Sequence, residues 1–399
     1  MNESIILHSD VNNFFASVEC ASKPELKDKP VAVAGNPEKR TGIILAKNEV
    51  AKKYGIKTGQ TIFEAKSLCP ELVCLEPHYH TYEKISSRLH KIYLEYTDQV
   101  EPLGLDECWL DVSSSSKVLG KTGEEIAFEI KERIKKEFGI TVSVGVSFSK
   151  IFAKLGSDLK KPDAVTVLTR ENFKEKTYQL PLNSIVGIGR RLEKKFTSMN
   201  VLTIEDFVNL EDSYLQKITN KTGVELKHAL LGEFDHKIAS YYDVEQVKSV
   251  GNGTTTVKDI TSRKDIEKVV YFLSEKVCHR LIYRSLIAKT VSISVKTNEL
   301  KTFGKSKTIY PTSSSQIFAK ECMILLDSFW KYDTPIRAVR VNGSNLESVH
   351  SSKQLSLFND KKEELAKSIA YLTKKYGENA IYVASETPDF INRHTFKEE

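Results

Sequence analysis

No stretch of about 18 consecutive apolar residues occurs in this chain of 399 residues, so a membrane-spanning helix is not expected. The first residues, Met-Asn-Glu-Ser-Ile-Ile-Leu, lack the basic segment and the long apolar segment of a signal peptide. The six cysteines are scattered and form no Cys-x-x-Cys pair, which argues against a zinc site and for a reducing compartment. We therefore expect a cytoplasmic protein without a membrane partner.

The sequence also shows no internal repeat and no low-complexity segment. Its length favours roughly two to four domains, and its composition is that of a globular protein. The net charge of +6 is unevenly distributed, because residues 244–350 hold 17 Lys and Arg but only 10 Asp and Glu. This surplus predicts a surface for an anionic partner, with a solvated charged face as the alternative.

The stretch Gly104-Leu-Asp-Glu-Cys-Trp-Leu-Asp111 places two adjacent carboxylates, Asp106 and Glu107, inside an apolar run that is typical of a short strand. Neighbouring residues of a strand point to opposite faces, so both carboxylates can reach one ion only at a strand end or bend. Burying them side by side requires a cation. The choice therefore lies between a metal site and a solvated acidic turn.

A third carboxylate, Asp10, lies near the end of the apolar run 5–11, which predicts a buried strand. Amphipathic helices are expected at 78–98 and 122–138, and a further strand at 141–148. This order indicates a split βαβ unit of the ferredoxin-like type, in which Asp10 would lie beside the Asp106 strand. The apolar residues of the second helix are expected to face the core: Ile126, Phe128, Ile130 and Ile134.

The remaining pattern predicts an α+β protein of several domains. Strands are expected at 30–35 and 42–46, helices at 48–54 and 59–70, and a helical segment from 168 to 235. A separate α+β domain is expected at 248–343, with strands at 253–259, 289–297, 305–311 and 336–343 and helices at 264–283 and 313–330.

Asp10, Asp106 and Glu107 together would offer three hard oxygen ligands at one edge of a sheet. Such ligands suit Mg²⁺, which also keeps water and binds substrate phosphates. Two such ions about 3.5–4 Å apart can activate an attacking hydroxyl and stabilise a leaving pyrophosphate. The segment from Ser149 to Pro162, with Lys154 and Lys161, adds a helix start and positive charge for a triphosphate, unless it is a surface lysine helix.

With these motifs the chain resembles a bacterial translesion polymerase of the Y-family. The segment Asp10-Val-Asn-Asn-Phe-Phe-Ala-Ser-Val-Glu19 is similar to the first family motif. Leu105-Asp-Glu-Cys-Trp-Leu-Asp111 is similar to the second, and Ser143-Val-Gly-Val-Ser through Lys161-Pro162 to the third. The resemblance spans about residues 1–360.

The resemblance implies a role for each matching residue. Asp10, Asp106 and Glu107 would be the catalytic metal ligands for two Mg²⁺ ions, with a contact from the Val11 carbonyl. Phe15 would be the steric gate that excludes a ribose 2′-hydroxyl, although it or Phe14 could instead be a core aromatic. The nucleotide triphosphate would be contacted by Lys161 and Lys52.

Two positions depart from the family pattern. Asn12 stands where many relatives have an acid, and Asn48-Glu-Val-Ala-Lys52 stands where many have a Tyr-Glu-Ala-Arg-like segment. The first departure concerns the metal geometry, and the second concerns phosphate contacts and nucleotide selection.

DNA contacts are expected in two places. The turn Gly187-Ile-Gly189 with Arg190 and Arg191 matches a helix–hairpin–helix, whose backbone N–H groups can hold a phosphate, although a plain helix-joining turn is the commoner cause of such a pattern. The basic domain resembles the family's little finger, with salt-sensitive backbone contacts. Its expected contributors are Lys248, Lys258, Arg284, Lys296, Lys305, Lys307, Arg337 and Arg340.

The polar tail after residue 343 contains one apolar cluster, formed by Gln354, Leu355, Leu357 and Phe358. Packing of the tail on the chain itself would explain these side chains, and so would insertion into a pocket of a partner. The cluster matches the relatives' binding motif for the sliding clamp. We expect a short charged helix at about 360–376.

The leading hypothesis is a low-fidelity, template-directed DNA polymerase for translesion synthesis, working as a monomer on primer–template DNA and dNTPs without a proofreading exonuclease. The alternatives are another palm-type enzyme, such as a nucleotidyl cyclase, and a non-catalytic DNA- and clamp-binding scaffold. The expected division is palm 1–20 and 79–167, fingers 21–78, thumb 168–235, linker 236–247, little finger 248–343 and tail 344–399.

Overall fold

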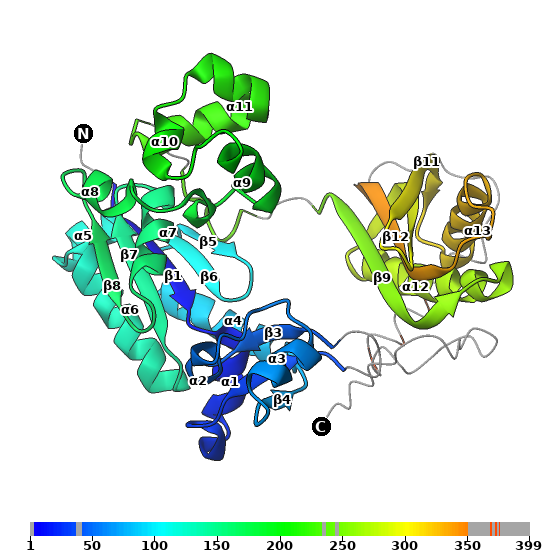
Figure 1. Ribbon diagram of the computed structural model, residues 1–399, viewed down its shortest axis with the longest axis horizontal. Coiled ribbons are helices and arrows are strands. Elements are labelled where there is room, and N and C mark those ends of the chain that lie inside the picture. The colour runs from blue at the N-terminus through cyan, green and yellow to red at the C-terminus, as the bar shows by residue number, and fades with distance from the viewer. Residues whose placement is uncertain are drawn as a thin grey trace. The chain divides into compact units, whose positions relative to one another are not determined.

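The structure is a computed structural model that describes residues 4–36, 42–233, 237–243 and 247–349, together with Ser368, Leu372 and Lys375. The chain divides into two compact units (Figure 1). The first contains residues 1–35 and 43–244, and the second contains residues 36–42 and 245–399.

A five-stranded sheet forms the centre of the first unit, in the order β5-β6-β1-β7-β8. The first four strands are antiparallel to their neighbours and have the ferredoxin-like order, which confirms the predicted fold class. β8 adds a parallel edge strand that the sequence pattern did not reveal. The strands are β1 (Ile6–Val11), β5 (Val100–Leu103), β6 (Glu107–Asp111), β7 (Val142–Ser147) and β8 (Val165–Leu168).

The two faces of this sheet are covered differently. α1 (Phe14–Ala21), α4 (Tyr79–Leu94) and α6 (Gly123–Phe138) build one core with Leu7 and Val11 of β1. α7 (Lys150–Leu159) packs on the opposite face, which carries Ile6, His8 and Asp10. α7 approaches so closely that a Cβ atom on Gly145 of β7 would lie 1.9 Å from the Ala153 carbonyl oxygen. A short helix, α5 (Ser113–Leu119), links β6 to α6.

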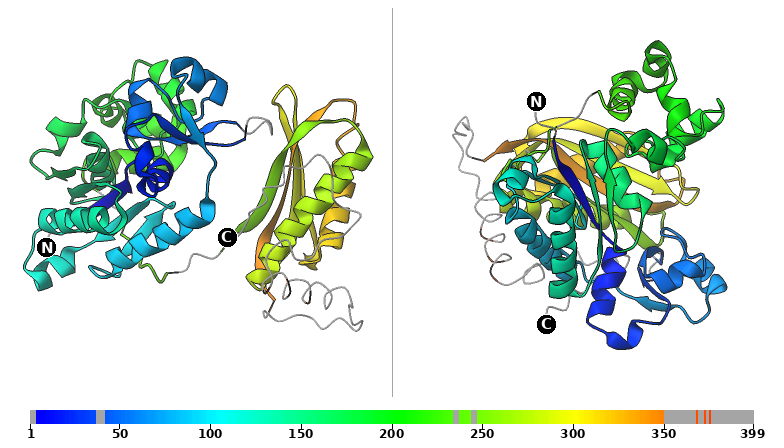
Figure 2. Two further views of the ribbon diagram at one scale, coloured as in Figure 1. Left: turned by 90° about the horizontal axis from the view of Figure 1, so that it is seen from below. Right: turned by 90° about the vertical axis from the view of Figure 1, so that its left-hand side faces the viewer.

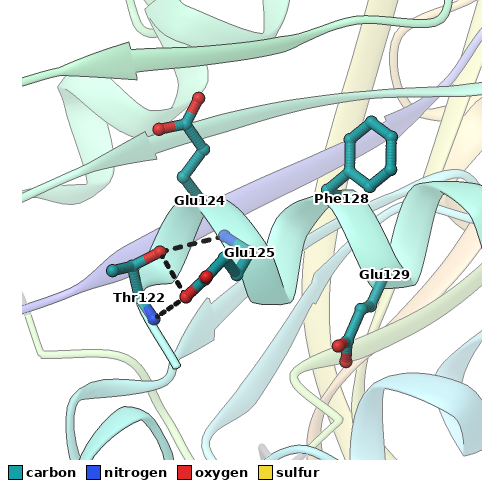
Figure 3. A pocket seen from close by; sticks show the side chains of 5 residues that line it. All are labelled: Thr122, Glu124, Glu125, Phe128 and Glu129. Carbon is teal, nitrogen blue, oxygen red and sulfur yellow. Dashed lines mark hydrogen bonds between the residues drawn. The ribbon is translucent and has the colours of Figure 1, made fainter. Parts of the chain in front are cut away.

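The expected core face of α6 is right except for Phe128, which is 54% exposed. Ile126, Ile130 and Ile134 recur every four residues and are fully buried, whereas Phe128 lies half a turn away from that stripe. Figure 3 shows its ring pointing outward beside Glu124 and Glu129, in a shallow pocket on the outer side of the helix. The helix starts with a capping box in which Thr122 and Glu125 bond each other's backbone N–H groups.

A small three-stranded sheet, in the order β3-β2-β4, forms the segment expected to be the fingers. Two strands and two helices follow the sequence pattern: β2 (Val31–Ala34), β3 (Ile44–Lys47), α2 (Glu49–Lys53) and α3 (Ile62–Leu68). β4 (Val73–Leu75) and the 3-10 turn η1 (Pro24–Leu26) span only three residues each, too few for a periodic signal.

The segment after β8 is helical, as predicted. Its elements are α8 (Phe173–Thr177), the 3-10 turn η3 (Leu182–Ser184), α9 (Arg190–Thr197), α10 (Ile204–Val208) and α11 (Asp212–Leu230). They enclose a separate core around Phe196, Phe207 and Leu215. α11 is interrupted at Asn220, whose φ of 57° is not helical.

The second unit is a four-stranded antiparallel sheet in the order β11-β10-β12-β9, with two helices on one face (Figure 2). The elements are β9 (Ser249–Ile260), α12 (Arg263–Tyr283), β10 (Leu286–Thr297), β11 (Thr302–Thr312), α13 (Ser315–Asp327) and β12 (Ile336–Ser348). The predicted polar tail starts too early at residue 344, because Ser344 still pairs with β10 and β9. The candidate clamp-binding residues Gln354 to Phe358 lie outside the described residues.

Within the described residues, every helix is too short or too polar to cross a lipid bilayer.

Candidate active site

Two of the predicted metal ligands lie opposite each other on neighbouring strands. Asp10 of β1 pairs in register with Glu107 of β6, and directly opposed residues of an antiparallel pair share one face. The face is that of α7, because His8, two residues before Asp10, bonds Ser157 of that helix through its ring. Strand register therefore brings together two carboxylates that are 97 positions apart in the sequence.

Asp106 lies in the tight turn that joins β5 to β6. Gly104 starts this turn with a φ of 88°, a conformation that favours glycine. The Asp106 carbonyl oxygen accepts a hydrogen bond from the Val11 N–H at 3.0 Å, which holds the turn against the end of β1. Asp106 thus escapes the strand alternation that would send it to the opposite face from Glu107.

Two lysines of the third sequence motif contact these carboxylates. The Lys161 ammonium donates to Asp10 Oδ2 at 2.7 Å and also lies 2.8 Å from Asp158. The Lys154 ammonium donates to Glu107 Oε2 at 2.5 Å and lies 3.6 Å from Asp10 Oδ2. Lys154 is buried, so the interpretation of this segment as a surface lysine helix is wrong for that residue.

A buried histidine that the sequence analysis missed, His8, contacts Glu107. The His8 Nε2 atom is 3.3 Å from Glu107 Oε2, and its Nδ1 atom is 2.8 Å from Ser157 Oγ. Burial lowers the pKa of His8, which favours the neutral ring. The alternation of β1 would have placed His8 on the face of Asp10, two residues away, but only the fold reveals its contact with Glu107.

The three carboxylates differ in their readiness to lose a proton. Burial, followed by the nearby charges of Asp10 and Glu107, raises the pKa of Asp106 to about 6. Burial also raises the pKa of Asp10, against the attraction of Lys161. For Glu107, burial is outweighed by its contacts with His8 and Lys154, which bring its pKa to about 2. Such divergent pKa values within one cluster are typical of functional sites.

The donor set fits Mg²⁺ in its chemistry, since it consists of carboxylate oxygens and a backbone carbonyl at a strand end. Among the described residues, however, no three acidic, histidine or cysteine side chains stand in a ready-made metal arrangement. The lysines hold Asp10 and Glu107 instead. Metal binding here would require the carboxylates and the ammonium groups to move apart.

The two aromatic residues of the first motif have different environments. Phe14 is buried in the core between the sheet and α4, whereas Phe15 is partly exposed and stacks on Tyr82 with ring centroids 4.3 Å apart. Phe14 is therefore the core aromatic of the pair, and Phe15 is the one that a ligand can reach.

The two departures from the family pattern have structural roles. Asn12 is buried, donates to Thr141 Oγ1 at 3.1 Å and accepts from the Ser143 hydroxyl at 3.0 Å, which braces β1 against β7. Asn48 caps α2 by accepting from the Ala51 N–H at 2.9 Å. Lys52 is half-exposed and lies 3.6 Å from Glu49, and no contact of Lys52 with Asp10, Asp106 or Glu107 is present among the described residues.

The turn predicted to be part of a helix–hairpin–helix lies between η3 and α9. Gly187 has a φ of 99°, and α9 begins at Arg190 directly after Gly189. Both glycines and Arg190 are exposed, so the free N–H groups at the start of α9 can meet a ligand from solution.

Among the described residues of the second unit, no helix covers the sheet face opposite α12 and α13, which we call the open face. Strand register places Lys296 and Arg340 on that face among small and hydroxyl-bearing residues of the neighbouring strands. Lys248 is exposed just before β9, and Arg337 lies at a register shift of β12. Lys305 and Lys307 point to the helix side, where Lys307 is 2.8 Å from Glu321, and their expected contacts with DNA stay a prediction.

Comparisons with known proteins agree with this architecture. The chain matches the model of the impB/mucB/samB family over residues 9–158 and that of the family's C-terminal domain over residues 247–357. A DNA polymerase IV of Acetivibrio thermocellus is 46% identical over 359 residues, which cover 89% of each chain. DNA polymerase IV 1 of Bacillus subtilis is 32% identical over 386 residues, which cover 94% of this chain and 92% of that protein.

Among solved structures, a Y-family DNA polymerase chimera is similar with a TM-score of 0.77 and 24% identity, over 86% of this chain and 99% of the other. A DinB structure from Sulfolobus solfataricus is similar with a TM-score of 0.56 and 25% identity, over 85% and 98%. The first family model, over residues 9–158, includes Asp10, Asp106 and Glu107, and the chain belongs to the Y-family DNA polymerases.

Proposed function

We propose that the chain is a low-fidelity, template-directed DNA polymerase that extends a primer 3′-hydroxyl with dNTPs opposite damaged templates. The observation that carries this proposal is the in-register pair of Asp10 and Glu107 with Asp106 in the adjoining turn. The names of the relatives, DNA polymerase IV, support it.

Asp10, Asp106, Glu107 and the Val11 carbonyl would hold two Mg²⁺ ions at the end of β1. When bound, these ions would activate the 3′-hydroxyl and neutralise the leaving pyrophosphate. Side chains of the protein would bind the triphosphate and select the sugar. Lys161, released from Asp10, would donate to the triphosphate, and the partly exposed Phe15 ring would occupy the space of a ribose 2′-hydroxyl.

The hairpin at Gly187, Gly189 and Arg190 and the open face with Lys296 and Arg340 would hold the phosphates of the duplex without reading its sequence. Residues 354–358 would bind a sliding clamp. The division into palm, fingers, thumb and little finger, the monomeric state, the lack of proofreading and the cytoplasmic location remain predictions of the same proposal.

Primer extension on a primed template with Mg²⁺ tests this function. The intact chain should extend the primer, and Asp106→Ala should reduce extension by about 10²-fold or more, the range for removing one charge-stabilising group. Extension that survives Asp106→Ala would refute the metal assignment. An intact chain that binds primed DNA but does not extend it would be a binding scaffold.

A further inference from the structure

Glu19 is a buried carboxylate that the proposed chemistry does not use. Its exposed fraction is 5%, and it lies on α1 one turn after Phe15. A buried carboxylate is costly unless donors surround it. The hydrogen-bond partners of Glu19 therefore indicate its structural role.

Two donors to Glu19 come from the start of α4. The Tyr82 hydroxyl donates to Glu19 Oε1 at 2.7 Å, and His78 Nδ1 lies 2.8 Å from the same oxygen. His78 and Tyr82 are one helical turn apart, so this single carboxylate oxygen contacts the first turn of α4 at two points. The Lys23 ammonium lies 3.5 Å from the other oxygen.

The Tyr82 ring has a second contact, on its face. It stacks on Phe15 with centroids 4.3 Å apart and an angle of 11° between the rings. Tyr79 meets both rings edge-on, at 5.8 Å from Phe15 and 5.9 Å from Tyr82. Tyr82 is fully buried, and burial together with the bond to Glu19 raises the pKa of its hydroxyl, which stays a donor.

We propose that Glu19 is the positioning residue of the sugar filter: it fixes the Tyr82 ring through the hydroxyl, and that ring fixes Phe15. The proposal rests on the assignment of Phe15 under the proposed function. A filter that rejects one hydroxyl group acts over a fraction of an ångström, so its support has to be rigid. A buried hydrogen bond to a charged acceptor supplies that rigidity.

Single-nucleotide insertion measures the effect as the ratio of kcat/KM for a dNTP to that for the matching rNTP. Tyr82→Phe keeps the stacked ring and removes only the hydroxyl, and Glu19→Leu removes the acceptor. Each should lower the ratio by about 10-fold, within the worth of one hydrogen bond to a charged group. The double variant should lower it no further, because both changes break the same bond.

Glu19→Gln retains an acceptor oxygen and should restore most of the ratio lost in Glu19→Leu. Tyr93→Phe is the matched control, because Tyr93 is also buried in α4 and its hydroxyl is 3.0 Å from Ser9 Oγ, but it has no contact with Phe15 among the described residues. Its ratio should match that of the intact chain. If Glu19→Leu does not fold, Tyr82→Phe with its Tyr93→Phe control decides alone.

Melting temperatures separate positioning from mere helix packing. Two results together would overturn the proposal. Tyr82→Phe and Glu19→Leu would lower the melting temperature but keep the dNTP/rNTP ratio of Tyr93→Phe, while Phe15→Ala would lower that ratio. A ratio that also stays unchanged in Phe15→Ala would instead overturn the assignment of the sugar filter itself. Absence of any insertion by the intact chain would overturn the polymerase function.

Discussion

The ammonium group of Lys154 lies between the carboxylates of Glu107 and Asp10, 2.5 Å from Oε2 of the first and 3.6 Å from Oδ2 of the second. It thus compensates the two charges that Mg²⁺ would otherwise neutralise. A resident cation of this kind allows the carboxylates to be buried before a metal arrives, since uncompensated buried charges are strongly destabilising.

Replacing Lys154 by Met should therefore make stability depend more strongly on Mg²⁺. Without Mg²⁺ the variant should lose on the order of 2 kcal/mol, less than for a fully buried pair because Glu107 is partly exposed. Added Mg²⁺ should recover part of that loss by binding the folded state. Thermal unfolding with and without Mg²⁺ measures this, with Lys150→Met as the control, because Lys150 lies on the same helix as Lys154 but pairs with Glu101 of β5. Equal Mg²⁺ effects in both variants would contradict the prediction.

Lys161→Ala should raise the KM for the incoming dNTP by about 10-fold, because one charge-assisted hydrogen bond to the triphosphate is lost. Steady-state insertion kinetics on a primed template measure it. Lys160→Ala removes an equal charge from an exposed neighbour and should leave KM within about twofold. Identical KM values for the two variants would show that Lys161 serves only its ion pairs with Asp10 and Asp158.

The stability of the helical segment should fall as pH rises above neutrality because of His228. Contacts with Glu233 and Asp212 raise the pKa of His228 above its ordinary 6.5, so the folded state holds a proton that the unfolded state releases. The stabilisation from protonated His228 is fully present below pH 6.5, and it is lost as the pH rises through the raised pKa of His228 in the folded state. Melting curves between about pH 6 and 8.5 should show this loss in the intact chain and not in His228→Gln. Parallel pH profiles would argue against it.

Two residues of α6 should differ sharply in their effect on stability. Ile130→Ala empties a fully buried position and should cost about 2–5 kcal/mol. Phe128→Ala removes a ring that is 54% exposed and should change stability by no more than about 0.5 kcal/mol. Chemical denaturation compares them directly. A large loss in Phe128→Ala would mean that its ring packs in a way the structure does not show.

Replacing Leu357 and Phe358 by Ala should abolish stimulation by a sliding clamp while clamp-free extension stays unchanged. Primer extension with and without the clamp tests this, with Ser352→Ala as a control in the same tail. Loss of clamp-free extension as well would indicate that the apolar cluster packs on the enzyme.

Much of the site could be predicted from the sequence because the apolar pattern that marks each strand is local. The runs around Asp10 and Glu107 were recognisable, and their pairing follows from the ferredoxin-like order of strands. The ion pairs of Lys154 and Lys161 could not be predicted, because they depend on how closely α7 packs across the sheet. The contact of His8 with Glu107 and the Tyr82 stack depend on the same long-range packing.

The error at Phe128 has an equally specific cause. Phe128 was assigned to the core by its hydrophobicity although it falls outside the stripe of Ile126, Ile130 and Ile134. Lys305 and Lys307 were expected among the DNA contacts; side-chain alternation on β11 places them on the helix side of the sheet, and their contact with DNA stays a prediction. For Phe128 the periodicity of the helix was the better guide than residue type.

The position of Lys154 beside Glu107 depends on Gly145, a residue that has no side chain and takes no part in the chemistry. Any larger residue there would push α7 outward, because the Ala153 carbonyl already occupies that space. Such a displacement would carry Lys154, the residue next to Ala153, away from Glu107 while all charged groups remained in the chain. The alignment of charges in this candidate active site thus depends on how closely α7 packs against β7.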